Sequence, residues 1–322
     1  MKRLRPFLFL CLLFPCLLGG CGITPDIPFQ NGGTTCGNIT MGRGGSAYSN
    51  GFIYTFSLSG GIYEYDLESN KTILLAPSDN TFRCQSLYAT DQYLYYWQRG
   101  LQCMTKDGQK STTVFERPDG CCQLFIQGED SYFLNGVGGQ LFYRNLTTGA
   151  EKVLAEHVNS YHTDAGYLYA ISIPDAADRS TFRLLRFPLD TLEPEVMPLQ
   201  MAPIAVYASG STLILSSMGT YQLVRYADGT ETQLPVYSLF YQVLDHSLIY
   251  MDEADFNSAD FYTVRSYDLE TGEIQTLMDH VISFTILENR YVVARRNGSH
   301  SDFYSVYDWE TQQEISTFGQ QE

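Results

Sequence analysis

Short runs of apolar and aromatic residues recur along the chain, and each run is bounded by Gly, Asn, Asp or Ser. The first of them reads "GFIYTF" and the second "QYLYYW". Runs of this length, rich in Tyr, Ile and Val and closed by turn residues, predict β-strands rather than helices. We predict seven such strands, at residues 51–56, 92–97, 131–136, 166–171, 211–216, 247–252 and 290–295.

Each of these seven apolar strands is followed along the chain by a further strand that ends in a polar turn. The phrase "YDLETGE" at 267–273 closely repeats "YDLESNK" at 65–71. Asp, Thr and Gly favour a tight hairpin, with Gly supplying a positive φ, so the phrase is interpreted as a turn and its strand rather than an active-site motif. The equivalent positions follow one another at intervals of 39 to 43 residues: Tyr65, Met104, Arg144, Phe187, Tyr226, Tyr267 and Tyr307.

A period near 40 residues, built of four short strands, is typical of a β-propeller. Large apolar side chains recur on both faces of strands such as "YLYYW" (93–97), as expected for sheets packed between other sheets. We therefore predict an all-β fold, a seven-bladed β-propeller of four-stranded antiparallel blades. Six or eight blades fit the spacing less well.

The strand "YLYYWQ" (93–98) and the recurring aromatic-Asp-Leu-x-Thr-Gly turn resemble propellers of the YWTD, low-density-lipoprotein-receptor type. They are more similar still to bacterial extracellular propeller domains of unknown function. The resemblance covers roughly residues 46–319 and implies a fold far more than an activity. YWTD propellers have six blades, so the count of seven is a departure from that family.

The N-terminal residues resemble a lipoprotein leader. "MKRLR" is a basic region, and the apolar run that follows, of about 13 residues, is shorter than the roughly 20 needed for a membrane-spanning helix. It closes on "LGGC", which resembles the bacterial lipobox. We predict a signal peptide over 1–20, acylation of Cys21 with palmitate-like chains, a Gly-, Thr- and Pro-rich tether over 21–45, and a propeller domain over 46–322.

Composition and charge change the picture of possible partners. The 322 residues are 44% hydrophobic and 14% aromatic, and 36 acidic residues outnumber 20 basic ones, for a formal net charge of −16. Such a surface repels phosphate backbones, so nucleic acid is excluded as a partner.

The lipid anchor predicts a location on the outer face of the bacterial cytoplasmic membrane, or on the outer membrane of a Gram-negative cell.

The longest loops are predicted on one end of the propeller. In a four-stranded meander with strands A to D running from the centre outward, B–C and D–A connections share one face. The long B–C loops are 172–180, 251–260 and 295–302, so we expect binding there. Their candidate residues are Asp175, Asp178, Arg179, Asp252, Glu253, Asp255, Asn257, Asp260, Arg296, Asn297 and His300.

Metal sites and catalytic motifs are not predicted. Asp252, Asp255 and Asp260 could supply oxygen ligands, but their spacing does not match a calcium loop and lacks its glycine. His157 and His280 each follow a carboxylate before an innermost strand, which is a weak pattern. We place His162 near a turn, with no partner pattern, and we assign no catalytic residue and no cofactor.

The cysteines include one candidate disulfide pair. Cys84 and Cys122 fall at matching points of the second and third repeats, at the start of the innermost strand, so a disulfide between adjacent blades is feasible. Ring closure remains open at this point. Either the first and last blades close by side-chain packing alone, which we favour, or "TTCGNITM" (34–41) joins the last blade as an outer strand.

The sequence thus predicts a monomeric, lipid-anchored propeller that acts as a non-catalytic binding or scaffold module for an envelope protein or a glycan. The alternative is a carbohydrate-active enzyme, a hydrolase or lyase, with carboxylates around the central channel. An enzyme should bring two or three carboxylates together in a cleft, whereas a binding module should present an exposed patch on the loop face.

Overall fold

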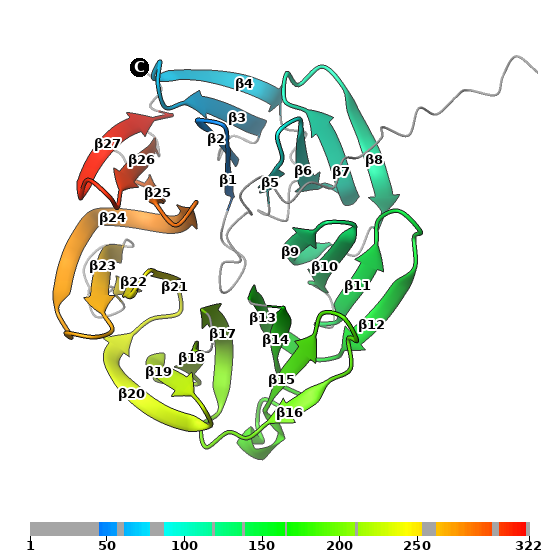
Figure 1. The fold of residues 1–322 in the computed structure, drawn as a ribbon, viewed down its shortest axis with the longest axis vertical. Coiled ribbons are helices and arrows are strands. Elements are labelled where there is room, and N and C mark those ends of the chain that lie inside the picture. The colour runs from blue at the N-terminus through cyan, green and yellow to red at the C-terminus, as the bar shows by residue number, and fades with distance from the viewer. Residues whose placement is uncertain are drawn as a thin grey trace, which may run out of the picture.

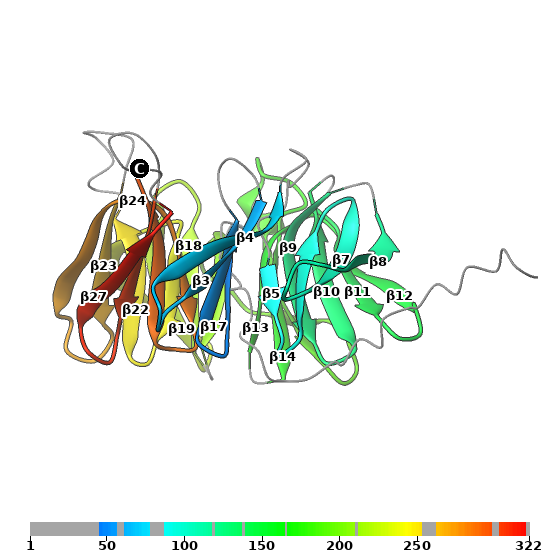
Figure 2. The same ribbon diagram turned by 90° about the horizontal axis from the view of Figure 1, so that it is seen from above.

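The computed structural model describes residues 45–56, 61–77, 87–117, 120–136, 139–164, 166–209, 212–252, 262–297 and 303–319. The prediction of an all-β propeller is confirmed: antiparallel sheets stand around a central axis like the blades of a fan (Figure 1). Figure 2 shows the same ring of sheets edge-on, where it has the outline of a thick disc. Among the residues described, no helix is long and apolar enough to cross a bilayer.

Five sheets contain four strands each, ordered as a simple meander. The first is β1 (Ser46–Ser49), β2 (Phe52–Phe56), β3 (Gly61–Asp66) and β4 (Lys71–Pro77). The second is β5 (Leu87–Ala89), β6 (Tyr93–Trp97), β7 (Gly100–Thr105) and β8 (Ser111–Glu116). The third is β9 (Cys121–Gln127), β10 (Asp130–Asn135), β11 (Leu141–Asn145) and β12 (Glu151–Ala155).

The fourth sheet is β13 (Val158–Asp164), β14 (Tyr167–Ser172), β15 (Arg183–Pro188) and β16 (Glu195–Met197), with the 3₁₀ turn η2 (Arg179–Thr181) between β14 and β15. The fifth is β17 (Pro203–Ser209), β18 (Thr212–Ser217), β19 (Gln222–Ala227) and β20 (Thr230–Tyr237). Five of the seven apolar strands predicted from the sequence agree with β2, β6, β10, β14 and β18 to within one residue at each end.

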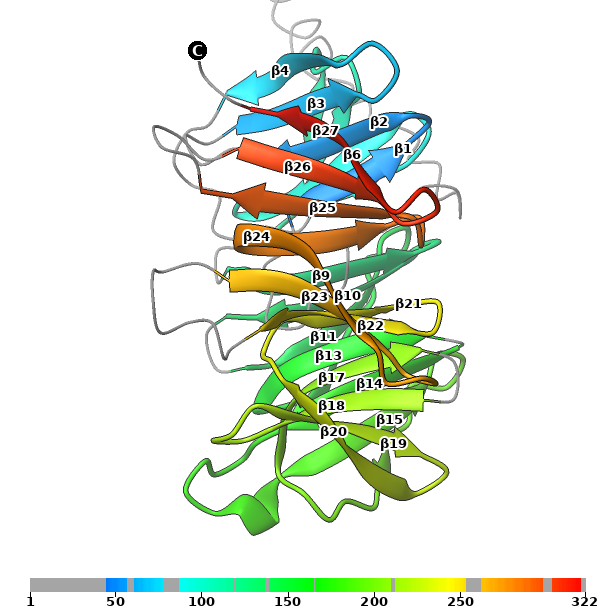
Figure 3. The ribbon, with the colours of Figure 1, turned by 90° about the vertical axis from the view of Figure 1, so that its left-hand side faces the viewer.

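The sixth sheet has seven strands, because one long strand serves two blades. It contains β21 (Tyr241–Leu244), β22 (Ser247–Asp252), β23 (Tyr262–Asp268), β24 (Ile274–Leu287), β25 (Tyr291–Arg296), β26 (Phe303–Asp308) and β27 (Gln313–Phe318). The first half of β24 pairs with β23 and the second half with β25, and both pairings meet at Val281. Divided there, the sheet gives two four-stranded units, so the described strands make seven blades (Figure 3).

The core lies in the seams between blades rather than at one centre. Seven clusters of buried side chains can be traced in the described part of the chain, and each joins two neighbouring blades. One of them joins the first blade to the last, with Ile53 and Tyr65 packed against Leu287, Val306 and Phe318. Because each sheet is covered on both faces, both faces of its strands must be apolar, which is the pattern seen in the sequence.

The repeated phrase is a turn between the third and fourth strands, as predicted. Asp268 Oδ1 accepts hydrogen bonds from the backbone N–H of Glu270 at 2.8 Å and of Thr271 at 2.7 Å, and Gly272 has a φ of 77°. In the first blade Asn70 takes the place of that glycine, with a φ of 56°. Asn tolerates the left-handed region better than most residues, so the same turn forms without a glycine.

Candidate functional site

The face formed by the B–C loops is described best at the fourth blade. Asp175 Oδ1 accepts the backbone N–H of Ala177 at 2.9 Å, and Asp178 Oδ1 accepts both N and Oγ of Ser180, at 3.0 and 2.7 Å. These hydrogen bonds, with that to the Ser180 hydroxyl the strongest, hold the pKa of Asp178 below its usual range. Both carboxylates therefore shape the loop, whereas Arg179 makes no ion pair with any described residue.

Other candidate residues are engaged in ion pairs. Asp252 contacts Arg265 with 3.1 Å between Oδ2 and Nε. Arg296 binds Asp279 at 2.7 Å and Glu314 at 3.0 Å, and so ties β25 to β24 and β27. These contacts hold the edges of blades together. Asn297 lies just beyond β25, where its N–H donates to His280 O at 3.0 Å.

Several predicted positions lie outside the described residues. They are the leader, Cys21 and the tether up to residue 44, the segment "TTCGNITM", Cys84, Glu253, Asp255, Asn257, Asp260 and His300, together with the side chain of Cys122. The acylation, the disulfide and the 253–260 loop therefore remain predictions from sequence. Cys103 and Cys121 are both buried, and the Cys121 thiol donates a hydrogen bond to the carbonyl oxygen of Gln123 at 2.9 Å.

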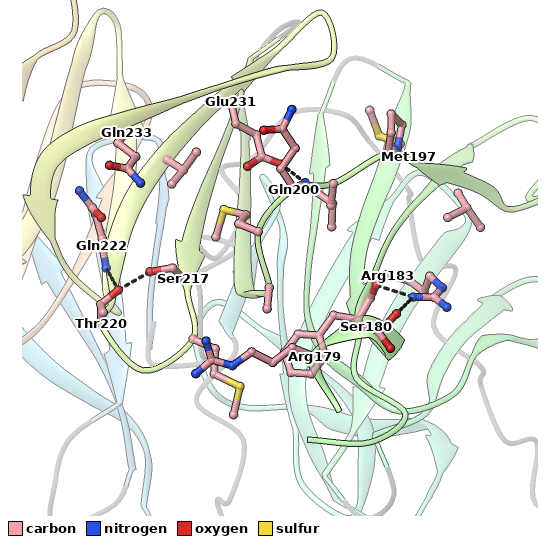
Figure 4. Close-up of a pocket in the computed structure, with 18 residues that line it drawn as sticks. Arg179, Ser180, Arg183, Met197, Gln200, Ser217, Thr220, Gln222, Glu231 and Gln233 are labelled. Atoms are coloured by element: carbon pink, nitrogen blue, oxygen red, sulfur yellow. Dashed lines mark hydrogen bonds between the residues drawn. The ribbon is translucent and has the colours of Figure 1, made fainter. Parts of the chain in front are cut away.

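A groove opens between the outer parts of the fourth and fifth blades, with a volume of about 970 Å³ (Figure 4). Its cause lies in β16, which has only three residues, whereas β20 opposite has eight. Pro194 and Pro198 flank β16, and because proline lacks the N–H that a strand ladder needs, they limit its length. The short strand leaves the facing surface of β19 and β20 uncovered.

Both apolar and polar side chains line the groove. The apolar ones include Val196, Met197, Leu199, Met201 and Met218, and the polar ones include Arg179, Arg183, Gln200, Gln222, Glu231 and Gln233. Of these residues the sequence analysis singled out Arg179 alone. It concentrated on long B–C loops, and the only local signal for the groove was the pair of prolines around "EVM".

Hydrogen bonds fix the lining residues at both ends of the groove. Glu231 Oε1 accepts the backbone N–H of Gln200 at 2.6 Å and so fixes the segment that enters the groove after β16. At the other end Arg183 Nη1 donates to the carbonyl oxygens of Ser180 at 2.6 Å and Phe182 at 2.8 Å. In Figure 4 Glu231 and Gln200 lie at the end opposite the two arginines.

The histidines divide into two structural groups. His157 and His280 are exposed, with φ angles of 56° and 55°, and their carbonyls accept matching hydrogen bonds from Ile173 and Asn297. Their shared place thus reflects a backbone kink before the innermost strand. His162 lies near a turn, as predicted, two residues before the end of β13 at Asp164, but it is part of the strand and is buried. Burial lowers its pKa to about 3.

Within the described ranges, no group of three or more His, Cys, Asp or Glu side chains is arranged to hold a metal ion.

A second groove of about 870 Å³ lies between the third and fourth blades, at the end of the propeller that carries the A–B and C–D turns. Its lining includes Glu129, Asp130, Asp190, Tyr132 and Tyr167. Asp130 Oδ1 accepts hydrogen bonds from the Tyr143 hydroxyl at 2.8 Å and the Asn145 amide at 3.1 Å.

Comparisons with known proteins show the fold. No family model and no curated protein matches the chain. Among solved structures it is similar to TolB from Acinetobacter baumannii, with 14% identity over 81% of this chain and 77% of the other, and a TM-score of 0.51. It is also similar to an oligogalacturonate lyase in complex with manganese, with 11% identity, 81% and 86% coverage, and a TM-score of 0.58.

A third likeness is to a chain of a mitotic checkpoint complex, with 10% identity, 80% and 83% coverage, and a TM-score of 0.53. At such low identity these likenesses carry the β-propeller fold alone. The neighbours include a lyase as well as a member of a protein complex, so fold does not separate an enzyme from a binding module. The resemblance to YWTD propellers remains a prediction from sequence.

Proposed function

We propose that this chain is a lipid-anchored, extracytoplasmic propeller that binds another component of the cell envelope without transforming it. The binding site is the groove between the fourth and fifth blades. The observation that carries the proposal is the groove itself: a concave surface of about 970 Å³ that combines apolar and polar side chains. Pockets that hold ligands combine these features, at about 300–1,000 Å³.

The groove also fits the expected geometry of the anchored protein. It borders the loop 172–180, one of the three long B–C loops, and so reaches the end of the propeller where the long loops are predicted to gather. A rigid ring of blades presents such a surface without having to order it on binding, which lowers the entropic cost of association. A protein or glycan of the envelope would be within reach of a domain held on a tether after Cys21.

Photo-crosslinking in intact bacteria tests the site. The full-length chain carries a photoreactive amino acid in place of Met218, which lines the groove, or in place of Ile73, which is 50% exposed on the outer strand of the first blade. We expect a specific crosslinked product from position 218 and not from position 73. Equal products from both positions, or no product from position 218, would refute the groove as the binding site.

The anchor is tested separately. Replacing Cys21 by Ser should abolish incorporation of labelled fatty acid and release the protein from the membrane fraction. Retention of the label in the Cys21→Ser chain would contradict acylation at this residue. The result is independent of the groove, because the tether and the fourth and fifth blades are far apart in sequence.

A second candidate function is a carbohydrate-active enzyme, and the groove between the third and fourth blades favours it. Hydrolysis of a glycosidic bond uses a pair of carboxylates, and this groove brings Glu129, Asp130 and Asp190 together with Tyr132 and Tyr167. Turnover of a panel of acidic and neutral polysaccharides, lost in the Asp130→Asn variant, would establish it. Turnover that survives the variant would place the chemistry elsewhere, and no turnover would favour the binding module.

A further inference from the structure

We propose that the groove between the fourth and fifth blades takes an extended protein segment that carries a carboxylate, and that Arg179 binds this carboxylate at the end of the groove where Arg183 also lies. The inference deepens the proposed function and rests on it. It chooses between the two classes of partner, protein and glycan, and it names the chemistry by which the partner is recognised.

The two arginines are the first argument, because most arginines of the described chain already have a carboxylate. Arg117 and Arg144 bind Glu151, and Arg186, Arg265, Arg290 and Arg296 bind Glu195, Asp252, Asp308 and Asp279. Arg179 and Arg183 form no ion pair with any described residue. In a chain with 36 acidic and 20 basic residues, two such arginines in the lining of one groove leave positive charge for an external anion.

The position of the guanidinium groups is the second argument. Arg183 is fixed by the carbonyls of Ser180 and Phe182, which occupy Nη1. Arg179 reaches from η2 toward the loop of the fifth blade, where a Cβ built on Gly219 would stand 3.5 Å from its Nη2. The Arg179 side chain therefore extends from the fourth blade to within van der Waals reach of the fifth.

The acidic groups nearby do not cancel this charge. Glu231 also lines the groove, but it accepts the backbone N–H of Gln200 and lies at the far end from the arginines (Figure 4). Asp178 is close enough for Arg183 to contribute to the lowering of its pKa, after the hydrogen bonds from Ser180. Its Oδ1 is already used by Ser180, which keeps it within its own loop.

The rest of the lining favours a peptide over a sugar. Met197, Met201 and Met218 are flexible thioethers that adapt to different apolar side chains. Gln200, Gln222 and Gln233 each offer an amide that can both donate to and accept from a peptide backbone. Phe182 is the one aromatic side chain in this lining, and it is only 5% exposed, so no ring is available for a sugar to stack on.

The experiment starts from the full-length lipoprotein in detergent and a library of displayed random peptides. We expect the selected peptides to be enriched in Asp or Glu next to aliphatic residues. A selected peptide should bind about tenfold more weakly when its acidic residue is changed to the amide, and by a similar factor when Arg179 is changed to Glu. The Arg179→Glu chain should recover binding to a peptide in which Lys replaces the acidic residue.

Arg225→Glu is the matched control. Arg225 is an exposed arginine of the fifth blade, on β19, but it does not line the groove, so the same change of charge there should leave the dissociation constant within about twofold. The selected peptide should also compete with crosslinking from position 218, which ties its binding to the groove.

The possible failures are distinguishable. If peptides compete at position 218 but show no acidic preference, or Arg179→Glu and Arg225→Glu act alike, the carboxylate assignment is wrong while the groove remains the binding site. If position 218 crosslinks a glycan, the protein class is wrong. If position 218 captures nothing at all in cells, the proposed function falls together with this inference.

Discussion

Tyr65 and Phe318 stack across the seam between the first and the last blade, with ring centroids 4.2 Å apart and 9° between the ring planes. The Tyr65 hydroxyl is also hydrogen-bonded to Ser316 Oγ and donates to Asn70 Oδ1. Within the described part of the chain, no strand of the first blade joins the sheet of the last. The described contacts that close the ring are therefore made by side chains; residues 34–41, the alternative predicted for closure, lie outside the described residues.

Phe318→Ala tests the strength of this seam. Phe318 is 5% exposed and packs on Tyr65 and Tyr304, so we expect the free energy of unfolding to fall by about 3 kcal/mol or more. Ile315→Ala, on the same strand but 44% exposed, should cost far less. Denaturant unfolding of both variants measures the difference. Equal losses would mean that β27 is stabilised in some way other than through the aromatic stack.

His162 should make the stability depend on pH. Its Nδ1 accepts the backbone N–H of Ala208 in the next blade at 3.2 Å, and burial lowers its pKa to about 3. Between that value and about 6.5, the usual histidine pKa, the unfolded chain binds a proton that the folded chain does not. The free energy of unfolding should therefore fall with decreasing pH in this window, by at most about 1.4 kcal/mol per pH unit from this residue.

His162→Gln removes that contribution but leaves a side chain that can accept the same bond. Gln242 does so elsewhere, since its Oε1 accepts the N–H of Ile286 in the next blade at 2.7 Å. The variant should show a flatter stability profile between pH 3 and 6.5, whereas His246→Gln, whose imidazole is 76% exposed, should follow the parent. A profile for His162→Gln that runs parallel to the parent would contradict the assignment.

Glu151 should stabilise the seam between the second and third blades. Its oxygens bind Arg117 at 2.7 Å and Arg144 at 3.0 Å, and these arginines lie over the rings of Phe142 and Phe115. Burial raises the pKa of Glu151, but the two arginines more than offset this and lower it overall. The stabilisation is therefore present at neutral pH and lost as the pH falls through the lowered pKa.

Glu151→Gln should lower the free energy of unfolding at pH 7 by about 1–2 kcal/mol. The comparison is Glu193→Gln, which breaks the pair with Lys152, where both side chains are about half exposed or more (49% and 77%) and a loss below about 0.5 kcal/mol is expected. Thermal unfolding at pH 7 and at pH 3 checks both changes. The two variants should converge toward the parent at the lower pH.

Gly108→Ala probes how closely two blades approach. Gly108 has a φ of 70°, and a Cβ there would stand 2.4 Å from the carbonyl oxygen of Leu75 in the first blade. Gly229 has a similar φ of 78° with nothing within 4 Å. Gly229→Ala should cost about 1 kcal/mol from the backbone alone, and Gly108→Ala at least about 1 kcal/mol more. Equal costs would show that the blades separate freely at this point.

The sequence was sufficient for the architecture because each blade repeats the same local physics. The interval between Tyr65 and Met104, and again between Tyr267 and Tyr307, spans four strands and their turns, and a sheet covered on both faces needs apolar residues on both. Both signals are local, so they can be read without coordinates. They also predicted the positive φ at Gly272.

The candidate site could be predicted only in part. Arg179 was found because it lies on a long loop, but the side chains that complete the groove come from β16, β19, β20 and the segment after Pro198. Their proximity depends on how far two blades splay at their outer ends, which a local pattern does not contain. Arg296, singled out by the same loop argument, turned out to hold three strands together.

The sequence by itself determined the blades, their order and the face on which the long loops gather, because hydrogen-bonded meanders follow from turn chemistry and alternation within about 40 residues. Only the tertiary structure decided which polar side chains are structural and which face a groove. His162 and Arg179 look alike in sequence, each a lone basic residue near a predicted turn. One is buried against the next blade and the other is exposed at a seam, because packing between blades sets the solvent exposure of each.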